Sequence, residues 1–151
     1  MDQPRPEHPR PQFQRRSWLN LNGEWRFALD FGDSGEERGW PADPTPLTGR
    51  ITVPFCPESR LSGVHHTDFI PAVWYHRTVR VPEAWRGRRV LLHFGGVDYD
   101  CRAWVNGQRV GRHLGGSSSF SFDITAALRA GENDLVVAAR DDVRSGAQPR
   151  G

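Results

Sequence analysis

The stretch from Val90 to His113 constrains the fold more than any other part of the chain. A short apolar run ends at a glycine pair, and from Val97 to Val105 every second residue is apolar, the period of a strand with one buried face. Asn106-Gly107 follows, the dipeptide that best tolerates the positive φ angles of a type I′ hairpin turn. The centre of the chain is therefore predicted to be an antiparallel β unit.

The segments on either side supply further short strands, separated by turn residues and with almost no helix. Strands are expected at 24–29, 51–53, 73–81, 90–94, 97–105, from 108, at 120–124 and at 135–139. About eight such strands predict an all-β fold, an antiparallel β-sandwich and more specifically a jelly roll. Residues 1–14, with prolines at every second or third position, are expected to form an extended arm, and residues 15–151 the folded domain.

Composition argues against several classes of function. All 20 basic residues are arginine, and a dispersed net charge of +2 does not predict a nucleic-acid surface. Cys56 and Cys101 lie far apart without metal-ligand spacing, so we expect neither a metal nor a cofactor, and a disulfide is left open. No segment has the length and apolarity of a membrane span, and no signal peptide is recognisable at the N-terminus. We expect a cytoplasmic protein.

Several motifs occur in a fixed order along 17–151: LNGEWRF, ITVPFCPES, VWYHRTVRVPEAWRGRRVLLHFGGVDYDCRAWVNGQRVGRHLGG, FSFDIT and AGENDLVV. Together they resemble the N-terminal sugar-binding domain of glycoside hydrolase family 2, the β-galactosidase, β-glucuronidase and β-mannosidase type. The resemblance implies a jelly roll of galactose-binding-like topology. It also implies that an immunoglobulin-like domain and a catalytic barrel follow, and that the barrel hydrolyses β-glycosidic bonds with retention.

The catalytic residues of that family are not expected in this chain. Retaining glycosidases use two carboxyl groups about 5–5.5 Å apart, and in this family the acid/base glutamate follows an asparagine. No asparagine here precedes a glutamate. We therefore expect the chain alone to be inactive. Relatives continue into another loop and a closing strand, so the sandwich is expected to lack its last strand.

Two sets of residues are candidates for a site. The first is the loop His65-His66-Thr67-Asp68, which the resemblance places near the barrel mouth, so that His66 and Asp68 would line the rim of the substrate pocket. The alternative is a solvated loop packed through its neighbouring apolar residues. The second set is aromatic: Trp74 and Trp104, with Trp85, could form a platform for a sugar or for another domain.

Three functions follow from these observations. The first is the non-catalytic domain of a family 2 enzyme acting on a carbohydrate, with catalytic and immunoglobulin-like domains as partners in the same protein. The second is a stand-alone carbohydrate-binding module, which requires the exposed aromatic platform. The third is a structural or assembly domain. A homo-oligomer is left open, and no nucleic-acid or membrane partner is expected.

Overall fold

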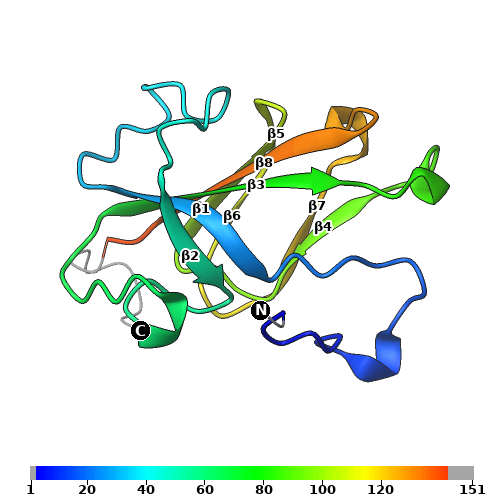
Figure 1. The fold of residues 1–151 in the computed structure, drawn as a ribbon, viewed down its shortest axis with the longest axis horizontal. Coiled ribbons are helices and arrows are strands. Elements are labelled where there is room, and N and C mark those ends of the chain that lie inside the picture. The colour runs from blue at the N-terminus through cyan, green and yellow to red at the C-terminus, as the bar shows by residue number, and fades with distance from the viewer. Residues whose placement is uncertain (1–2, 143–151) are drawn as a thin grey trace.

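The computed structural model describes residues 3–142 and is built almost entirely from antiparallel strands (Figure 1). The described part of the chain contains eight strands, the number expected from the sequence. They are β1 (Gly23–Asp30), β2 (Gly49–Val53), β3 (Ala72–Arg80), β4 (Leu91–Phe94), β5 (Asp100–Val105), β6 (Gln108–Leu114), β7 (Phe120–Asp123) and β8 (Glu132–Arg140). A short 3-10 turn, η1 (Pro11–Phe13), precedes β1, and three more lie in connections between strands: η2 (Arg60–Ser62), η3 (Glu83–Trp85) and η4 (Thr125–Ala127).

Six strands form one sheet in the order β2-β1-β3-β8-β5-β6. The predicted hairpin is confirmed at β5 and β6, where Val105 pairs with Gln108 across Asn106-Gly107. Asn106 has φ 52° and Gly107 φ 79°, the positive values for which this dipeptide is suited. The long pairing of β3 with β8 holds the two halves of the sheet together, because these strands are distant in the chain but run side by side for their full length.

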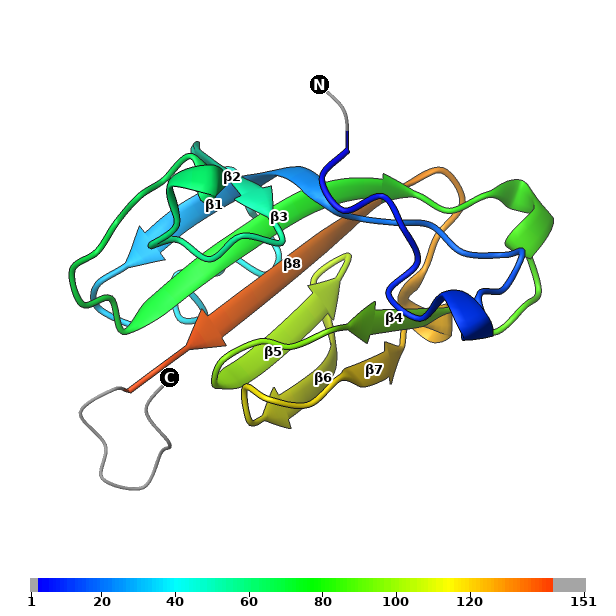
Figure 2. The same cartoon turned by 90° about the horizontal axis from the view of Figure 1, so that it is seen from below.

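The second sheet contains β4 and β7 and lies on the other side of the main apolar core (Figure 2). Trp25 and Phe27 of β1 and Val137 of β8 meet Leu92 of β4 in this core. Each large apolar side chain buried there contributes roughly 1.5–3 kcal/mol. The antiparallel sandwich is thus confirmed. The prediction that the sandwich lacks its last strand concerns the chain after residue 142 and lies outside the described residues.

The opposite face of the six-stranded sheet carries a second apolar cluster. Its members are Trp40, Leu47, Trp74, Trp104, Val136 and Ala138. Trp40 and Leu47 come from the loop between β1 and β2, which folds back over the sheet. Asp30 fixes the start of this loop, since its carboxylate accepts hydrogen bonds from the Gly35 N–H (2.7 Å) and from Trp74 Nε1 (3.0 Å). A loop rich in glycine and proline therefore closes what would otherwise be an open sheet face.

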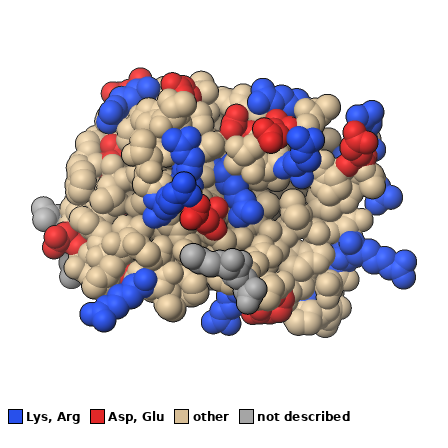
Figure 3. All heavy atoms as spheres, viewed as in Figure 1, with Lys and Arg blue, Asp and Glu red and all other residues tan. Residues whose placement is uncertain are grey.

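Within residues 3–22 the turn η1 is the only regular element, and the beginning of this segment lies against its end. Gln3 Nε2 donates to the carbonyls of Asn20 (2.9 Å) and Asn22 (3.1 Å), and Asn20 Nδ2 donates to the Arg5 carbonyl (2.9 Å). On the face seen in Figure 3, basic and acidic side chains are interspersed.

Candidate functional site

One end of the sandwich brings together segments that are far apart in the sequence. There β3 begins, β8 ends, and the connection from β4 to β5 arrives beside them. The Asp141 N–H donates to the Pro71 carbonyl (3.1 Å), and the Tyr99 N–H donates to the Arg140 carbonyl (3.2 Å). The long loop from β2 to β3 lies at the same end (Figure 1). Backbone pairing alone therefore fixes the relative positions of three connecting segments.

These segments concentrate carboxylates. We call the group formed by Glu58, Asp98, Asp141 and Asp142 the acidic end. Burial raises the pKa of Asp141, and the negative charges of Asp98, Asp142 and Glu58 raise it further. These charges come from three separate stretches of the chain, so the fold brings Glu58 and Asp98 close enough to Asp141 to act on it.

Two glycine pairs, Gly95-Gly96 and Gly115-Gly116, shape the position of Asp98. A Cβ atom at Gly116 would stand 2.5 Å from Asp98 Oδ1, so only glycine lets the carboxylate approach the backbone there. The Gly115 N–H donates to the Tyr99 carbonyl (2.8 Å), and a Cβ at Gly96 would stand 3.0 Å from the Gly116 carbonyl oxygen. The glycines thus allow the β4–β5 and β6–β7 connections to approach each other closely.

Asp100, two residues further on, has a different environment. Its side chain is 8% exposed, and both its oxygens accept from the Arg112 guanidinium at 2.8 Å. Burial disfavours the charged form, but the hydrogen bonds and charges of Arg112 and Arg102 outweigh it and hold the pKa of Asp100 below its usual 3.8. Arg102 also donates to Glu36 (2.6 Å). Asp100 is therefore a structural carboxylate that ties β5 to β6.

The structure places His66 and Asp68 in the loop between β2 and β3, beside the acidic end. The His66 N–H donates to the Pro57 carbonyl (2.9 Å), and its ring meets that of Phe31 with centroids 6.1 Å apart. Its Nε2 atom is buried and has no hydrogen-bond partner in the described part of the chain. Asp68 is exposed, as are Phe31 and Phe69. The role of His66 and Asp68 at the rim of a substrate pocket stays a prediction.

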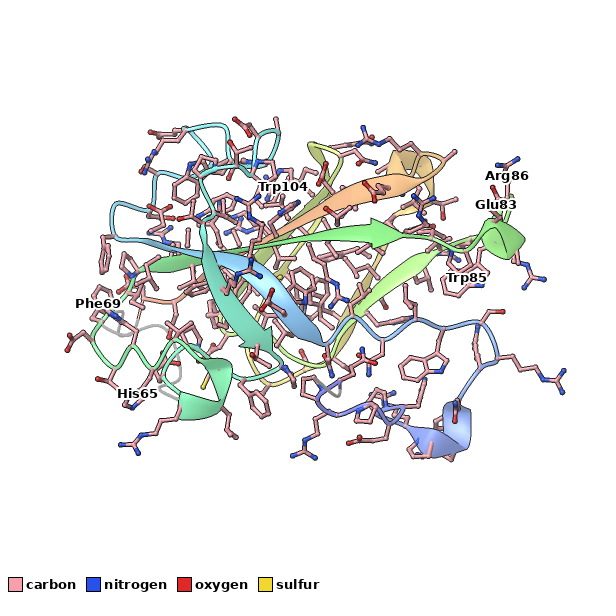
Figure 4. The ribbon with its side chains drawn as sticks, viewed as in Figure 1. His65, Phe69, Glu83, Trp85, Arg86 and Trp104 are labelled. Carbon is pink, nitrogen blue, oxygen red and sulfur yellow. The ribbon has the colours of Figure 1, made fainter. Side chains whose placement is uncertain are left out.

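Trp74 and Trp104 do not form a surface platform. They are 2% and 4% exposed, and their rings stack on each other with centroids 5.3 Å apart. Trp40 covers Trp74 edge-on at 5.6 Å. Trp104 does lie on the face of β5 opposite the main core, as its strand phase predicts, but the β1–β2 loop buries that face. Because this loop covers them, Trp74 and Trp104 present no exposed ring face as a sugar platform. Trp85 lies at the end of the molecule opposite His65 and Phe69 (Figure 4).

The described residues also bear on metal binding, disulfides and membrane-spanning helices. Within residues 3–142, no group of three or more histidine, cysteine, aspartate or glutamate side chains is arranged to hold a metal ion. Cys56 is exposed and Cys101 is buried, and both are free thiols. Over the same residues, no helix has the length and apolar character needed to cross a membrane.

Comparison with known proteins agrees with this picture. The family described as "Glycosyl hydrolases family 2, sugar binding domain" matches residues 18–143. A β-glucuronidase of Paenibacillus borealis is 33% identical over 128 residues, which are 85% of this chain and 22% of the relative. A β-galactosidase of Thermoanaerobacter pseudethanolicus is 29% identical over 133 residues, 85% of this chain and 17% of the relative.

Solved structures give the same result. A β-glucuronidase from an uncultured Clostridium species superimposes with a TM-score of 0.68 at 32% identity, covering 80% of this chain and 21% of the other. The chain thus spans about a fifth of the length of the relatives it matches. Because the family match extends over most of its length, the chain belongs to glycoside hydrolase family 2, as a sugar-binding domain.

Proposed function

We propose that this chain is the N-terminal, non-catalytic domain of a longer cytoplasmic enzyme that hydrolyses β-glycosides. An immunoglobulin-like domain and a barrel with the two catalytic carboxyl groups would follow it. The relatives support this proposal, because each is an enzyme several times longer than the segment it shares with this chain. Their names point to β-glucuronides or β-galactosides as the substrate class.

The observation that carries the proposal is the convergence of polar loops at one end of a rigid sandwich. Functional residues are commonly held on loops at the edge of such a scaffold. The acidic end presents carboxylates, which are hydrogen-bond acceptors of the kind that sugar hydroxyl groups need, and the His66–Asp68 loop lies beside it through the bond from the His66 N–H to the Pro57 carbonyl. In this proposal the sandwich positions that end against the barrel mouth, where His66, Asp68 and Asp98 form part of the pocket rim.

The exposed aromatic side chains of the same end fit contact with a second domain. Phe31 is 64% exposed and Phe69 is 42% exposed. Burial of such side chains against a partner surface stabilises the contact by removing apolar area from water. Association of several copies of the full protein remains compatible with this arrangement. A stand-alone carbohydrate module of the aromatic-platform type loses its support with the burial of Trp74 and Trp104.

The test compares the 151-residue chain with the complete protein from its source. The complete protein should have a mass well above that of the chain and should hydrolyse p-nitrophenyl β-D-glucuronide or β-D-galactoside, whereas the chain alone should hydrolyse neither. In the complete protein, Asp98→Asn and Asp68→Asn should raise KM, while Glu83→Gln at the opposite end (Figure 4) should not. Hydrolysis by the chain alone, or a native protein of only 151 residues, would overturn the proposal.

A further inference from the structure

Two of the four asparagines in the chain are followed by glycine, at Asn22-Gly23 and at Asn106-Gly107. Asparagine is chemically labile in this context, because glycine has no side chain to shield its backbone nitrogen. That nitrogen attacks the asparagine Cγ and forms a C–N bond, while its proton leaves with the side-chain NH2 group as ammonia. Water then opens the cyclic imide and gives aspartate or isoaspartate, so the reaction needs no oxidant or reductant.

The Asn106 side chain is fixed at both ends of its amide. Its Nδ2 donates to the Ala127 carbonyl (2.9 Å) and to Asn133 Oδ1 (2.8 Å), and its Oδ1 accepts from the Asp134 N–H (3.0 Å). The attack requires the side chain to turn back onto the next backbone nitrogen, so all three hydrogen bonds must open first. The corner that closes the β5–β6 hairpin therefore protects its own turn sequence from the reaction.

The Asn22 side chain is held only by the N-terminal arm. Its Nδ2 donates to the carbonyls of Pro4 and Arg5, both at 3.3 Å, which is long for a hydrogen bond. Its Oδ1 has no hydrogen-bond partner among residues 3–142. Arg5 is exposed and belongs to a segment without strand pairing, so a small movement of the arm frees the amide. The same dipeptide is thus weakly held at this position.

Conversion of Asn22 also changes what holds the arm. The amide is a donor, whereas the carboxylate that replaces it is only an acceptor and faces the Pro4 and Arg5 carbonyls with no hydrogen to offer. An isoaspartate adds one methylene to the main chain immediately before β1. It displaces the Asn22 carbonyl, which accepts from Gln3 Nε2 (3.1 Å) and from Arg77 Nη1 (3.1 Å).

We propose that Asn22-Gly23 is a site of spontaneous deamidation in the folded chain, that the hairpin protects Asn106-Gly107, and that conversion of Asn22 releases the arm from the start of β1. This inference concerns a covalent change in the chain itself and does not depend on the proposed function.

The test incubates the 151-residue chain at mildly alkaline pH and measures conversion at both steps. Trypsin separates them, because Asn22 lies in the peptide 17–26 and Asn106 in the peptide 103–109. Mass spectrometry then detects the replacement of NH2 by OH. In native buffer Asn22 should convert at least about tenfold faster than Asn106, the effect of one further hydrogen bond. In urea that unfolds the chain, the two rates should be similar.

Two variants test the cause of the protection. Asn133→Ala removes one of the three bonds to Asn106 and should raise the rate there about tenfold, with the rate at Asn22 unchanged. Ile51→Ala is the matched control, because Ile51 is 1% exposed in the main core and its truncation destabilises the fold without touching either step. Ile51→Ala should accelerate Asn106 much less than Asn133→Ala does.

Asn22→Asp reproduces the aspartate product and tests the release of the arm. Trypsin does not cut before proline, which excludes the bonds after Arg5 and Arg10. The bonds after Arg15 and Arg16 remain as reporters. Cleavage there should be about fivefold faster than in wild type, because two weak hydrogen bonds to the arm are lost and cleavage follows the open population.

A rate at Asn106 equal to or above that at Asn22 in native buffer overturns the proposal. Equal acceleration of Asn106 by Asn133→Ala and Ile51→Ala also overturns it, since global unfolding would then control the reaction. Unchanged trypsin cleavage in Asn22→Asp overturns the release of the arm. Faster conversion of Asn22 in native buffer, together with faster cleavage of Asn22→Asp, supports the proposal.

Discussion

Asn133 offers the sharpest test of how the hairpin and the β8 strand are held together. The side chain is 2% exposed and makes four hydrogen bonds. Its Oδ1 accepts from the Arg129 N–H and from Asn106 Nδ2, both at 2.8 Å. Its Nδ2 donates to the carbonyls of Arg129 (3.0 Å) and Gly131 (3.1 Å). Asn133→Ala removes all four bonds and leaves their partners without this amide.

The magnitude follows from the bond count. A neutral hydrogen bond contributes about 0.5–1.5 kcal/mol net, so four contribute roughly 2–6 kcal/mol. Water can reach part of the surface turn after substitution, and we therefore expect a loss of about 3 kcal/mol in the free energy of unfolding. This is a large fraction of the roughly 5–15 kcal/mol typical of a domain.

Urea unfolding followed by tryptophan fluorescence measures the change. With a slope of about 2 kcal/mol/M, the urea midpoint should fall by about 1.5 M. Asn20→Ala is the comparison, because the Asn20 amide makes two hydrogen bonds in a more exposed place, and it should cost less than about 1 kcal/mol. A urea midpoint for Asn133→Ala equal to that of Asn20→Ala would refute the assignment of Asn133 as the residue that holds the β5–β6 hairpin against β8.

Two further predictions concern ionisable groups. Since Arg112 and Arg102 overcome the burial of Asp100 and hold its pKa below 3.8, its contribution is present above that pH and is lost as the pH falls through the lowered pKa; Tm should fall in acid, and less steeply in Arg112→Gln. An identical pH profile for wild type and variant would contradict this. Burial raises the pKa of the Cys101 thiol to about 12, so iodoacetamide at neutral pH should label Cys56 alone in the folded chain and both thiols in urea, as read by mass spectrometry. Labelling of both in the folded chain would show that Cys101 is accessible.

Strand positions were predictable because the signals are local. The hairpin between β5 and β6 follows from alternation and from Asn106-Gly107, and the structure confirms it. The strand order β2-β1-β3-β8-β5-β6 was not predictable, since pairing of β3 with β8 depends on contacts between residues about sixty positions apart. No local pattern specifies such a partner.

The candidate site shows the same limit. Alternation correctly assigned Trp104 to the face opposite the main core, but it gave no information about what covers that face. The covering residues, Trp40 and Leu47, lie in a loop whose glycine and proline content indicates exposure. An aromatic residue on an outward strand phase is therefore weak evidence for a ligand platform.

The different roles of Asp98 and Asp100 follow from where the β5–β6 ladder begins. Asp100 pairs with Leu114, which brings Arg112 to the diagonal position from which its fork reaches both carboxylate oxygens. Asp98 precedes the first pair of that ladder, and its carboxylate makes no hydrogen bond or ion pair among the described residues. The two aspartates share residue type and strand phase, so the sequence cannot separate them. The register neutralises one and leaves the other at the acidic end with its hydrogen-bonding capacity unused.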